Sequence, residues 1–191
     1  MISQRRYANV LPSWAYDPPP LVMKGGDPYV RALMRTISAS EANYARPYSV
    51  LYGGRRIDDL SQHPNQCLLI MTGPNKGDCT TAAGRYQFLT QTWLEKAEKY
   101  HPERSLLWIH HDYPFDPEFQ DEVVYHWLMD TSAWNMDVST HLRAGELDVV
   151  LKRLSGTWTS LGYGLETNSV SPKLPRIYEK MLDAELAIAN F

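Results

Sequence analysis

The recurrence of apolar residues at helical spacing is the feature that most constrains the fold of this chain. The first such stretch begins at Asp27-Pro28, where aspartate suits the N-cap position and proline suits the first helical turn. Val30, Leu33 and Ile37 follow on one face of the expected helix. Similar stretches begin near residues 86, 116, 137, 147 and 171. The periodicity therefore predicts a mostly helical domain.

The pattern changes over residues 47–60. Tyr48, Val50 and Tyr52 recur at every second position, and Gly53-Gly54 follows, a pair that tolerates the positive φ angles of a tight turn. We expect a small β-hairpin here and irregular chain over most of residues 65–83. The expected fold class is α+β, mostly helical.

The N-terminal residues 1–26 differ in composition from the rest of the chain. They contain Pro18-Pro19-Pro20 and Gly25-Gly26, and consecutive prolines favour a stiff extended segment. We therefore expect a Pro/Gly-rich arm at residues 1–26 and one folded domain at residues 27–191. The side chains available to hold the arm on the domain surface are Trp14, Tyr16 and Leu21.

Charge and hydropathy exclude several classes of partner. The net charge is −3 and the longest basic cluster is Arg55-Arg56, so nucleic acid is not an expected partner. The first ten residues carry Arg5 and Arg6 and no apolar run, which is unlike a signal peptide. No stretch approaches the roughly 20 apolar residues of a membrane span. We expect synthesis in the cytoplasm without a signal peptide, and no membrane insertion.

Cys67 and Cys79 are the only cysteines. Two cysteines alone do not make a zinc site, which needs four clustered ligands, so no metal site is expected. A disulfide across the intervening loop is geometrically possible, but two free thiols are the favoured interpretation for a chain made in the cytoplasm.

Glu41 is the first candidate for chemistry. It follows Ile37 by four residues and so lies on or beside the apolar face, close to the end of the first helix. A carboxyl group there is partly desolvated and faces the negative end of the helix dipole, and both effects favour the protonated acid. Glu41 therefore suits a general acid, although a solvated or paired carboxylate is the alternative.

Other catalytic classes find little support. Asp58 and Asp59 lie on the returning strand of the expected hairpin. One of them could face a cleft beside Glu41 and act as the second carboxylate of a hydrolytic glycosidase. The favoured alternative is that both are solvated residues at the end of the strand. The adjacent His110-His111 do not have metal-ligand spacing, and there is no HExxH, GxSxG or GxGxxG pattern.

Local patterns in a fixed order resemble the lambda-phage endolysin family of lytic transglycosylases, over about residues 29–183. Ala83-Gly84-Arg85-Tyr86-Gln87 and the Gly-Gly turn are the specific matches. The supporting ones are Ser40-Glu41, the run from Tyr52 through Asp59, Ser61, His63 and Pro64, Phe115-Asp116-Pro117 with Gln120-Asp121, and Trp158-Thr159-Ser160-Leu161 with Tyr163-Gly164. Ala42 stands where the family has glycine.

The resemblance implies a lysozyme-like fold for residues 27–191, in which a helix carries the catalytic glutamate into a cleft and a small β-hairpin forms one wall. Carried over residue by residue, Glu41 is the catalytic acid. The residues that the resemblance implies for substrate binding are Ser40, Asp59, Arg85, Tyr86, Gln87 and Tyr163. It implies no metal and no organic cofactor.

The implied function is cleavage of peptidoglycan at the β-1,4 bond between N-acetylmuramic acid and N-acetylglucosamine, with a 1,6-anhydro product and a single catalytic glutamate. The alternatives are a hydrolytic muramidase that uses Asp58 or Asp59, and a non-catalytic peptidoglycan-binding module. The resemblance also implies a monomer that reaches the cell wall after release by a holin. A further possibility is that the domain docks through residues 1–26 to a phage or secretion assembly. Deletion of these residues would then remove docking and leave catalysis intact.

Overall fold

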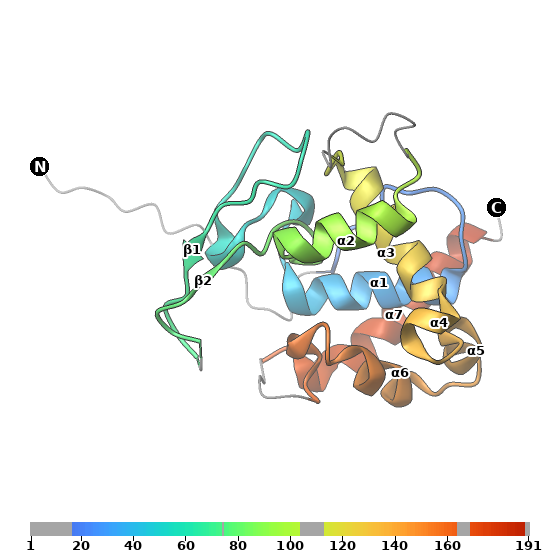
Figure 1. Cartoon of the computed structure of the whole chain (residues 1–191). Coiled ribbons are helices and arrows are strands. Elements are labelled where there is room, and N and C mark those ends of the chain that lie inside the picture. The colour runs from blue at the N-terminus through green and yellow to red at the C-terminus, as the bar shows by residue number, and fades with distance from the viewer. Residues whose placement is uncertain (1–16, 74, 104–112, 164–168, 190–191) are drawn as a thin grey trace, which may run out of the picture.

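A computed structural model describes residues 17–73, 75–103, 113–163 and 169–189. Within these residues the fold is a body of helices with a small two-stranded sheet projecting from it (Figure 1). The α-helices are α1 (Pro28–Glu41), α2 (Thr90–Tyr100), α3 (Pro117–Met129), α4 (Thr131–Trp134), α5 (Val138–Arg143), α6 (Leu147–Leu154) and α7 (Leu174–Ala189). Short 3-10 helices span Pro47–Ser49, Tyr52–Gly54, Thr159–Leu161 and Ser171–Lys173. The mostly helical α+β class is confirmed.

Helix α1 runs through the centre of the helical body and packs against α7, α3 and α5. As expected, the Asp27 side chain caps it by accepting from the Tyr29 backbone N–H, and Pro28 occupies the first turn. Residues 30–39 are all buried. Two of them are arginines, and both form ion pairs with the buried Glu185 of α7: Arg31 Nε at 2.6 Å and Arg35 Nη1 at 3.0 Å. This packing fixes the direction in which the helix ends, at Glu41.

The segment before α1 differs from the expected arm, because its described part belongs to the core. Leu21 and Met23 are buried in the main hydrophobic cluster. The carbonyl oxygens of the three prolines accept from buried guanidinium groups, those of Pro18 and Pro19 at 2.7 Å and 2.6 Å. Proline has no N–H, so an extended proline run offers acceptors only, and arginine supplies the donors. Trp14 and Tyr16 lie outside the described residues.

The sheet is not where the sequence predicts it. Gly53 and Gly54 do reverse the chain, with φ angles of 74° and 82°, but only one bridge, Val50 to Arg56, links the two sides. The backbone here pairs instead with residues 82–88: Tyr52 N–H donates to Ala82 O at 3.0 Å. The expected hairpin at 47–60 is therefore wrong in position.

The two strands lie in residues 65–83, which were expected to be mostly irregular. Strand β1 (Leu68–Leu69) pairs antiparallel with β2 (Cys79–Thr80), Leu68 opposite Thr80. Cys67 and Cys79 form a disulfide, so the expectation of free thiols is wrong. The antiparallel pairing brings the two cysteines near each other, because Cys67 directly precedes β1 and lies diagonally across the ladder from Cys79, with their Cα atoms 5.4 Å apart.

The remaining helices follow the periodicity with small shifts. Helix α2 starts at Thr90 rather than near residue 86, because Gly84 and Gln87 have positive φ angles of 75° and 48° and form a turn. Helix α3 starts at Pro117, as expected. The single-turn α4 was not expected, and Asp130 caps it by accepting from two backbone N–H groups. Among the described residues, no helix has the length and apolar character to cross a membrane.

Candidate active site

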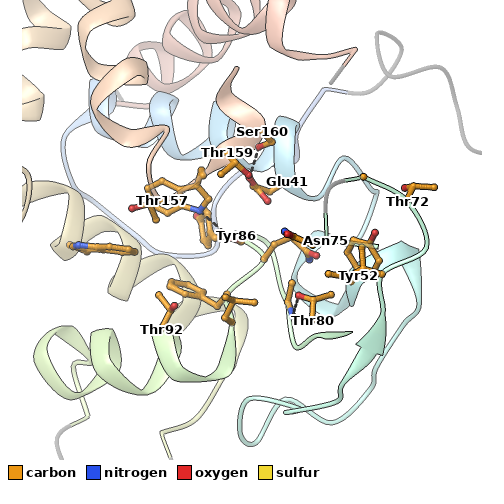
Figure 2. A pocket seen from close by; sticks show the side chains of 18 residues that line it. Glu41, Tyr52, Thr72, Asn75, Thr80, Tyr86, Thr92, Thr157, Thr159 and Ser160 are labelled. Atoms are coloured by element: carbon orange, nitrogen blue, oxygen red, sulfur yellow. Dashed lines mark hydrogen bonds between the residues drawn. The ribbon is translucent and has the colours of Figure 1, made fainter. Parts of the chain in front are cut away.

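A cleft of about 740 Å³ lies between the end of α1 and the β1–β2 hairpin. Its lining comes from distant parts of the chain: Glu41 from α1, the hairpin residues, the turn at 82–89, and residues 157–160. Figure 2 shows Glu41 and Ser160 together at one side, with Thr72 and Thr80 of the hairpin across from them. A helix does bring a glutamate to a cleft that has a hairpin as one wall, but this hairpin is β1–β2 rather than the one expected at residues 47–60.

Glu41 is partly buried and is held by a serine cluster. The Ser160 hydroxyl donates to Glu41 Oε1 and lies 3.0 Å from Ser40 Oγ. The Ser40 hydroxyl donates to the Ile37 carbonyl at 2.9 Å within α1. Because the proton of Ser40 is engaged by its own helix, the Ser160 proton is available to the carboxylate. The pair fixes the orientation of the one acidic group among the described residues that line the cleft.

Ser160 reaches Glu41 because its own segment is tightly anchored. It lies in the short 3-10 helix Thr159–Leu161, which ends at Gly162 with a φ of 97°. The Ser171 hydroxyl donates to the Ser160 carbonyl at 2.8 Å. Just before it, the indole N–H of Trp158 donates to the Tyr86 carbonyl at 3.1 Å. The contact therefore depends on tertiary packing rather than on local sequence.

The 83–88 turn forms the floor of the cleft. Ala83 and Phe88 pair with each other across the turn, and Gly84 fits only because it has no Cβ, which would lie 2.3 Å from Gln120 Oε1. Gln87 lines the cleft while its Nε2 donates to the Val50 and Gly84 carbonyls at 3.2 Å and 2.9 Å. These two hydrogen bonds from Nε2 fix the orientation of the whole Gln87 side-chain amide, including its oxygen.

Tyr86 and Arg85 are part of the interior more than of the cleft. Tyr86 lines the cleft, but its hydroxyl donates to Asp121 Oδ1 at 2.6 Å, and complete burial together with the Asp121 charge raises its pKa well above the ordinary value. Arg85 is fully buried and donates to Pro19 O, Pro20 O and the Tyr48 hydroxyl. It is not among the cleft-lining residues, so the structure does not bring this expected substrate contact to the cleft.

Asp121 is the centre of the interior network. Its Oδ2 accepts from the Tyr48 hydroxyl at 2.7 Å and from the Val22 backbone N–H at 2.7 Å, opposite the Tyr86 bond to Oδ1. Burial raises the pKa of the Asp121 carboxyl, while the Arg85 charge and the tyrosine hydroxyls oppose that rise. The network joins the N-terminal segment, α3 and the 83–88 turn, and so holds the floor of the cleft in place.

Asp59 and Tyr163 also lie away from the cleft lining. Asp59 is exposed, and hydrogen bonds from the Ser61 hydroxyl and N–H hold its pKa below the ordinary value. Asp58 is exposed as well. Tyr163 is 42% exposed and donates to Asp148, and partial burial and this bond raise its pKa to about 12. Tyr163 borders a separate hollow with Leu151 and Pro175.

Comparison with known proteins agrees with the geometry of the cleft. A family model described as Endolysin matches residues 31–183. The chain belongs to the endolysin family. Its activity is therefore that of a lysozyme-like enzyme that cleaves peptidoglycan in the cell wall. Among curated proteins, none matches the chain in sequence.

Two solved structures share the fold of this endolysin. The structure of bacteriophage lambda lysozyme complexed with a chitohexasaccharide has a TM-score of 0.59 and 24% identity, over 83% of this chain and 97% of that one. A structure of lysozyme from bacteriophage lambda has a TM-score of 0.59 and 22% identity, over 85% of this chain and 97% of that one. The lambda lysozyme-like fold expected from the sequence is confirmed.

Several cleft residues of this endolysin were not singled out from the sequence. Thr159 and Ser160 belong to a motif that marks the family without showing their individual contacts, and Thr157 lies two residues before Thr159, outside that motif. Ile70, Thr72, Asn75 and Thr80 come from the hairpin, which carries no periodic signal. Glu41 is the only ionisable carboxylate among the described lining residues. The described residues also contain no cluster of histidine, cysteine and carboxylate side chains suited to a metal ion.

Proposed function

We propose that this endolysin is a lytic transglycosylase, which breaks the β-1,4 bond between N-acetylmuramic acid and N-acetylglucosamine and leaves a 1,6-anhydro end. One observation carries the proposal: within the described part of the cleft lining, Glu41 is the sole carboxylate. A hydrolytic glycosidase commonly needs a second carboxylate to activate water or to act as nucleophile. An intramolecular attack by a substrate hydroxyl does not.

The reaction uses Glu41 twice. The protonated carboxyl donates its proton to the glycosidic oxygen, the bond from that oxygen to the anomeric carbon breaks, and the carbon gains oxocarbenium character. The carboxylate then takes the proton of the muramyl 6-hydroxyl while that oxygen bonds to the anomeric carbon. Glu41 is protonated again at the end, and no water is consumed. Such acid–base assistance contributes on the order of 100- to 10,000-fold in rate.

Ser160 serves the charged form of Glu41. Its hydroxyl donates to Oε1, and a hydrogen bond to an ionised acceptor is stronger than one to a neutral acceptor. The bond thus compensates the charge that appears on Glu41 after the first proton transfer.

The composition of the cleft suits an uncharged glycan backbone. Its walls combine hydroxyl and amide groups, among them Thr157, Thr159 and Asn75, with the small accessible parts of the buried Trp127 and Trp158. Short polar side chains bond to hydroxyl and N-acetyl groups, and apolar wall atoms contact the sugar rings. The complex of bacteriophage lambda lysozyme with a chitohexasaccharide supports a glycan in the corresponding cleft here.

The alternative is a hydrolase in which another carboxylate activates water. Asp58 and Asp59 are exposed and absent from the cleft lining, which disfavours them. Glu166 lies outside the described residues, so it must be tested directly. Mass spectrometry of fragments released from purified peptidoglycan separates the reactions, since an anhydro end is lighter than a reducing end by one water.

The variants to compare are Glu41→Gln, Asp59→Asn and Glu166→Gln. We expect anhydro-ended fragments from the wild type, Asp59→Asn and Glu166→Gln, and none from Glu41→Gln. Reducing-ended fragments would overturn the proposal in favour of hydrolysis. A folded wild type that binds the wall and releases nothing would instead indicate a binding module.

We also propose that the enzyme acts as a monomer after release to the wall through a holin. The support is the family membership, because endolysins act on the cell wall. Light scattering at assay concentration tests the monomer. Lysis of cells that express the chain with and without an artificial membrane lesion tests the release step, and lysis without any lesion would contradict it.

A further inference from the structure

The β1–β2 hairpin supplies one wall of the cleft but has almost no attachment to the core. Ile70, Thr72, Asn75 and Thr80 from this hairpin line the cleft. None of the described residues from 64 to 82 is buried, and the large side chains of Leu69 and Met71 are 58% and 64% exposed. Among the described residues of the two strands and their connection, Leu68 is the hydrophobic side chain that packs against the core. Hydrophobic packing therefore holds the wall that faces the glycan only at its base.

The backbone bonds within the hairpin form a short ladder and a turn. The ladder consists of Leu68 opposite Thr80 and Leu69 opposite Cys79, and beyond it Ile70 N–H donates to Asp78 O at 2.8 Å and Ile70 O accepts from Gly77 N–H at 3.0 Å. The other backbone bonds among the described hairpin residues lie within the turn at residues 73–78. An isolated two-stranded hairpin is marginally stable in water. In Figure 1 the strands project away from the helices of the described part of the chain.

The disulfide between Cys67 and Cys79 is what closes this loop. It joins the start of β1 to β2, so that residues 68–78 lie within the closed ring. A cross-link of this kind removes conformations of the open loop and so favours the paired state. Both cysteines are exposed to solvent, so a redox partner can reach them.

We propose that the Cys67–Cys79 disulfide sets the glycan affinity of the cleft, so that oxidation of the two thiols converts a weakly binding enzyme into a tightly binding one. The inference rests on the proposed function, and it adds the control of that same site. Glu41 and Ser160 sit on segments anchored in the helical body, so the proton-transfer groups stay in place in either redox state.

The activating step is thiol–disulfide exchange. The Cys67 and Cys79 thiols lose two protons and two electrons as the S–S bond forms, and a disulfide-containing oxidant takes up both and leaves as two thiols. In a reducing compartment the dithiol persists, and in an oxidising one the bond forms. The disulfide that holds the cleft wall therefore forms in the oxidising compartment, on the side of the membrane where the peptidoglycan lies.

Reduction is expected to act on the half-saturating substrate concentration more than on the maximal rate. If the reduced hairpin adopts the paired state in roughly one molecule in ten, the apparent affinity falls about tenfold. The maximal rate changes little, because bound glycan selects molecules with the wall in place.

The experiment compares the oxidised wild type, the wild type reduced with a phosphine, and the double variant Cys67→Ser with Cys79→Ser, on purified peptidoglycan over a range of concentrations. Gln66→Ser is the matched control, an exposed neighbour outside the cleft lining. The phosphine added to the double variant controls for the reductant itself. We expect the reduced wild type and the double serine variant, which both lack the disulfide, to need about ten times more substrate than the oxidised wild type for half the maximal rate.

Equal half-saturating concentrations in the oxidised and reduced proteins would overturn the inference. Loss of the near-ultraviolet circular dichroism of the helical body on reduction would also overturn it, because the bond would then hold the whole fold. Sedimentation of Glu41→Gln with insoluble peptidoglycan, oxidised and reduced, measures binding without turnover. That arm keeps the inference testable even if the wild type releases no fragments.

Discussion

The helical body and the β1–β2 hairpin face the same cleft but are stabilised in different ways. In the body, Asp121 alone links Tyr48, Tyr86 and the backbone of Val22 through buried hydrogen bonds. In the hairpin, exposed strands are joined by a short ladder and the Cys67–Cys79 bond. The difference teaches that the proposed proton-transfer group, Glu41, belongs to the more firmly packed side of the cleft, and the proposed glycan-binding wall to the side that is less firmly packed.

The sharpest test of this division is Glu41→Gln. The amide keeps the shape of the carboxyl but cannot donate and recover a proton, so fragment release should fall on the order of 100- to 10,000-fold. Thermal stability should change little, because Glu41 sits at the end of α1 rather than within its buried face. If Glu41→Gln released fragments at the wild-type rate, Glu41 would not be the proton-transfer group.

The next largest effect is expected from Asp121→Asn in the body. Neutralising this buried carboxylate leaves the Arg85 guanidinium uncompensated, and breaking a buried charged network costs about 3 kcal/mol or more of unfolding free energy. Urea titration measures it. The matched change in the hairpin is Met71→Ala, which should stay within about 0.5 kcal/mol of the wild type. Equal losses at both sites would contradict the comparison.

Ser160→Ala removes the hydrogen bond to the Glu41 carboxylate without touching the wall. A hydrogen bond to a charged group contributes about 1.5–3 kcal/mol, so the maximal rate should fall at least about tenfold, with the half-saturating peptidoglycan concentration nearly unchanged. Thr159→Ser, a neighbouring cleft residue, is the control. A change confined to the half-saturating concentration would assign Ser160 to glycan binding instead.

The smallest effect concerns acid stability. Burial lowers the pKa of His63 and of His101, so the unfolded chain takes up protons before the folded one does. Their contribution is present above about pH 6.5, the unfolded value, and is lost as the pH falls through the lower folded values. The melting temperature should therefore drop between about pH 7.5 and about pH 5.

The control for the acid effect is the exposed His126. His63→Gln should reduce the pH dependence of the melting temperature, whereas His126→Gln should leave it as in the wild type. Both buried rings pack on Phe115 or its neighbours in the body, so acid should weaken that side of the cleft first. An unchanged slope in His63→Gln would refute this assignment.

The sequence predicts the body better than the hairpin for a physical reason. Helix α1 is specified locally by a cap, a proline and an apolar period, and its last residue is the catalytic candidate. Residues 68–80 have no alternation to mark strands, and their pairing depends on a disulfide that two cysteines alone do not encode. The single-turn α4 is too short to show a period.

The site is only partly predictable from the sequence, because a motif does not show in which direction each of its side chains points. Arg85 and Gln87 belong to one motif, yet Arg85 points to the proline carbonyls and Gln87 lines the cleft. Nothing local separates them, since the turn at Gly84 decides which side chain faces inward. Ser160 lies 119 residues from Glu41, so their contact follows from tertiary packing alone.

The proline run at the start of the described chain bears on how this enzyme can be recombined with other modules. The family match begins at residue 31, but Pro18 and Pro19 accept hydrogen bonds from Arg35 and Arg85, and Val22 donates to Asp121. A chimera that starts at the family boundary would lack the Pro18 and Pro19 carbonyls, so the buried Arg35 and Arg85 would each lose hydrogen-bond acceptors. The transferable catalytic unit therefore includes residues 17–26, and a fused targeting module belongs before them.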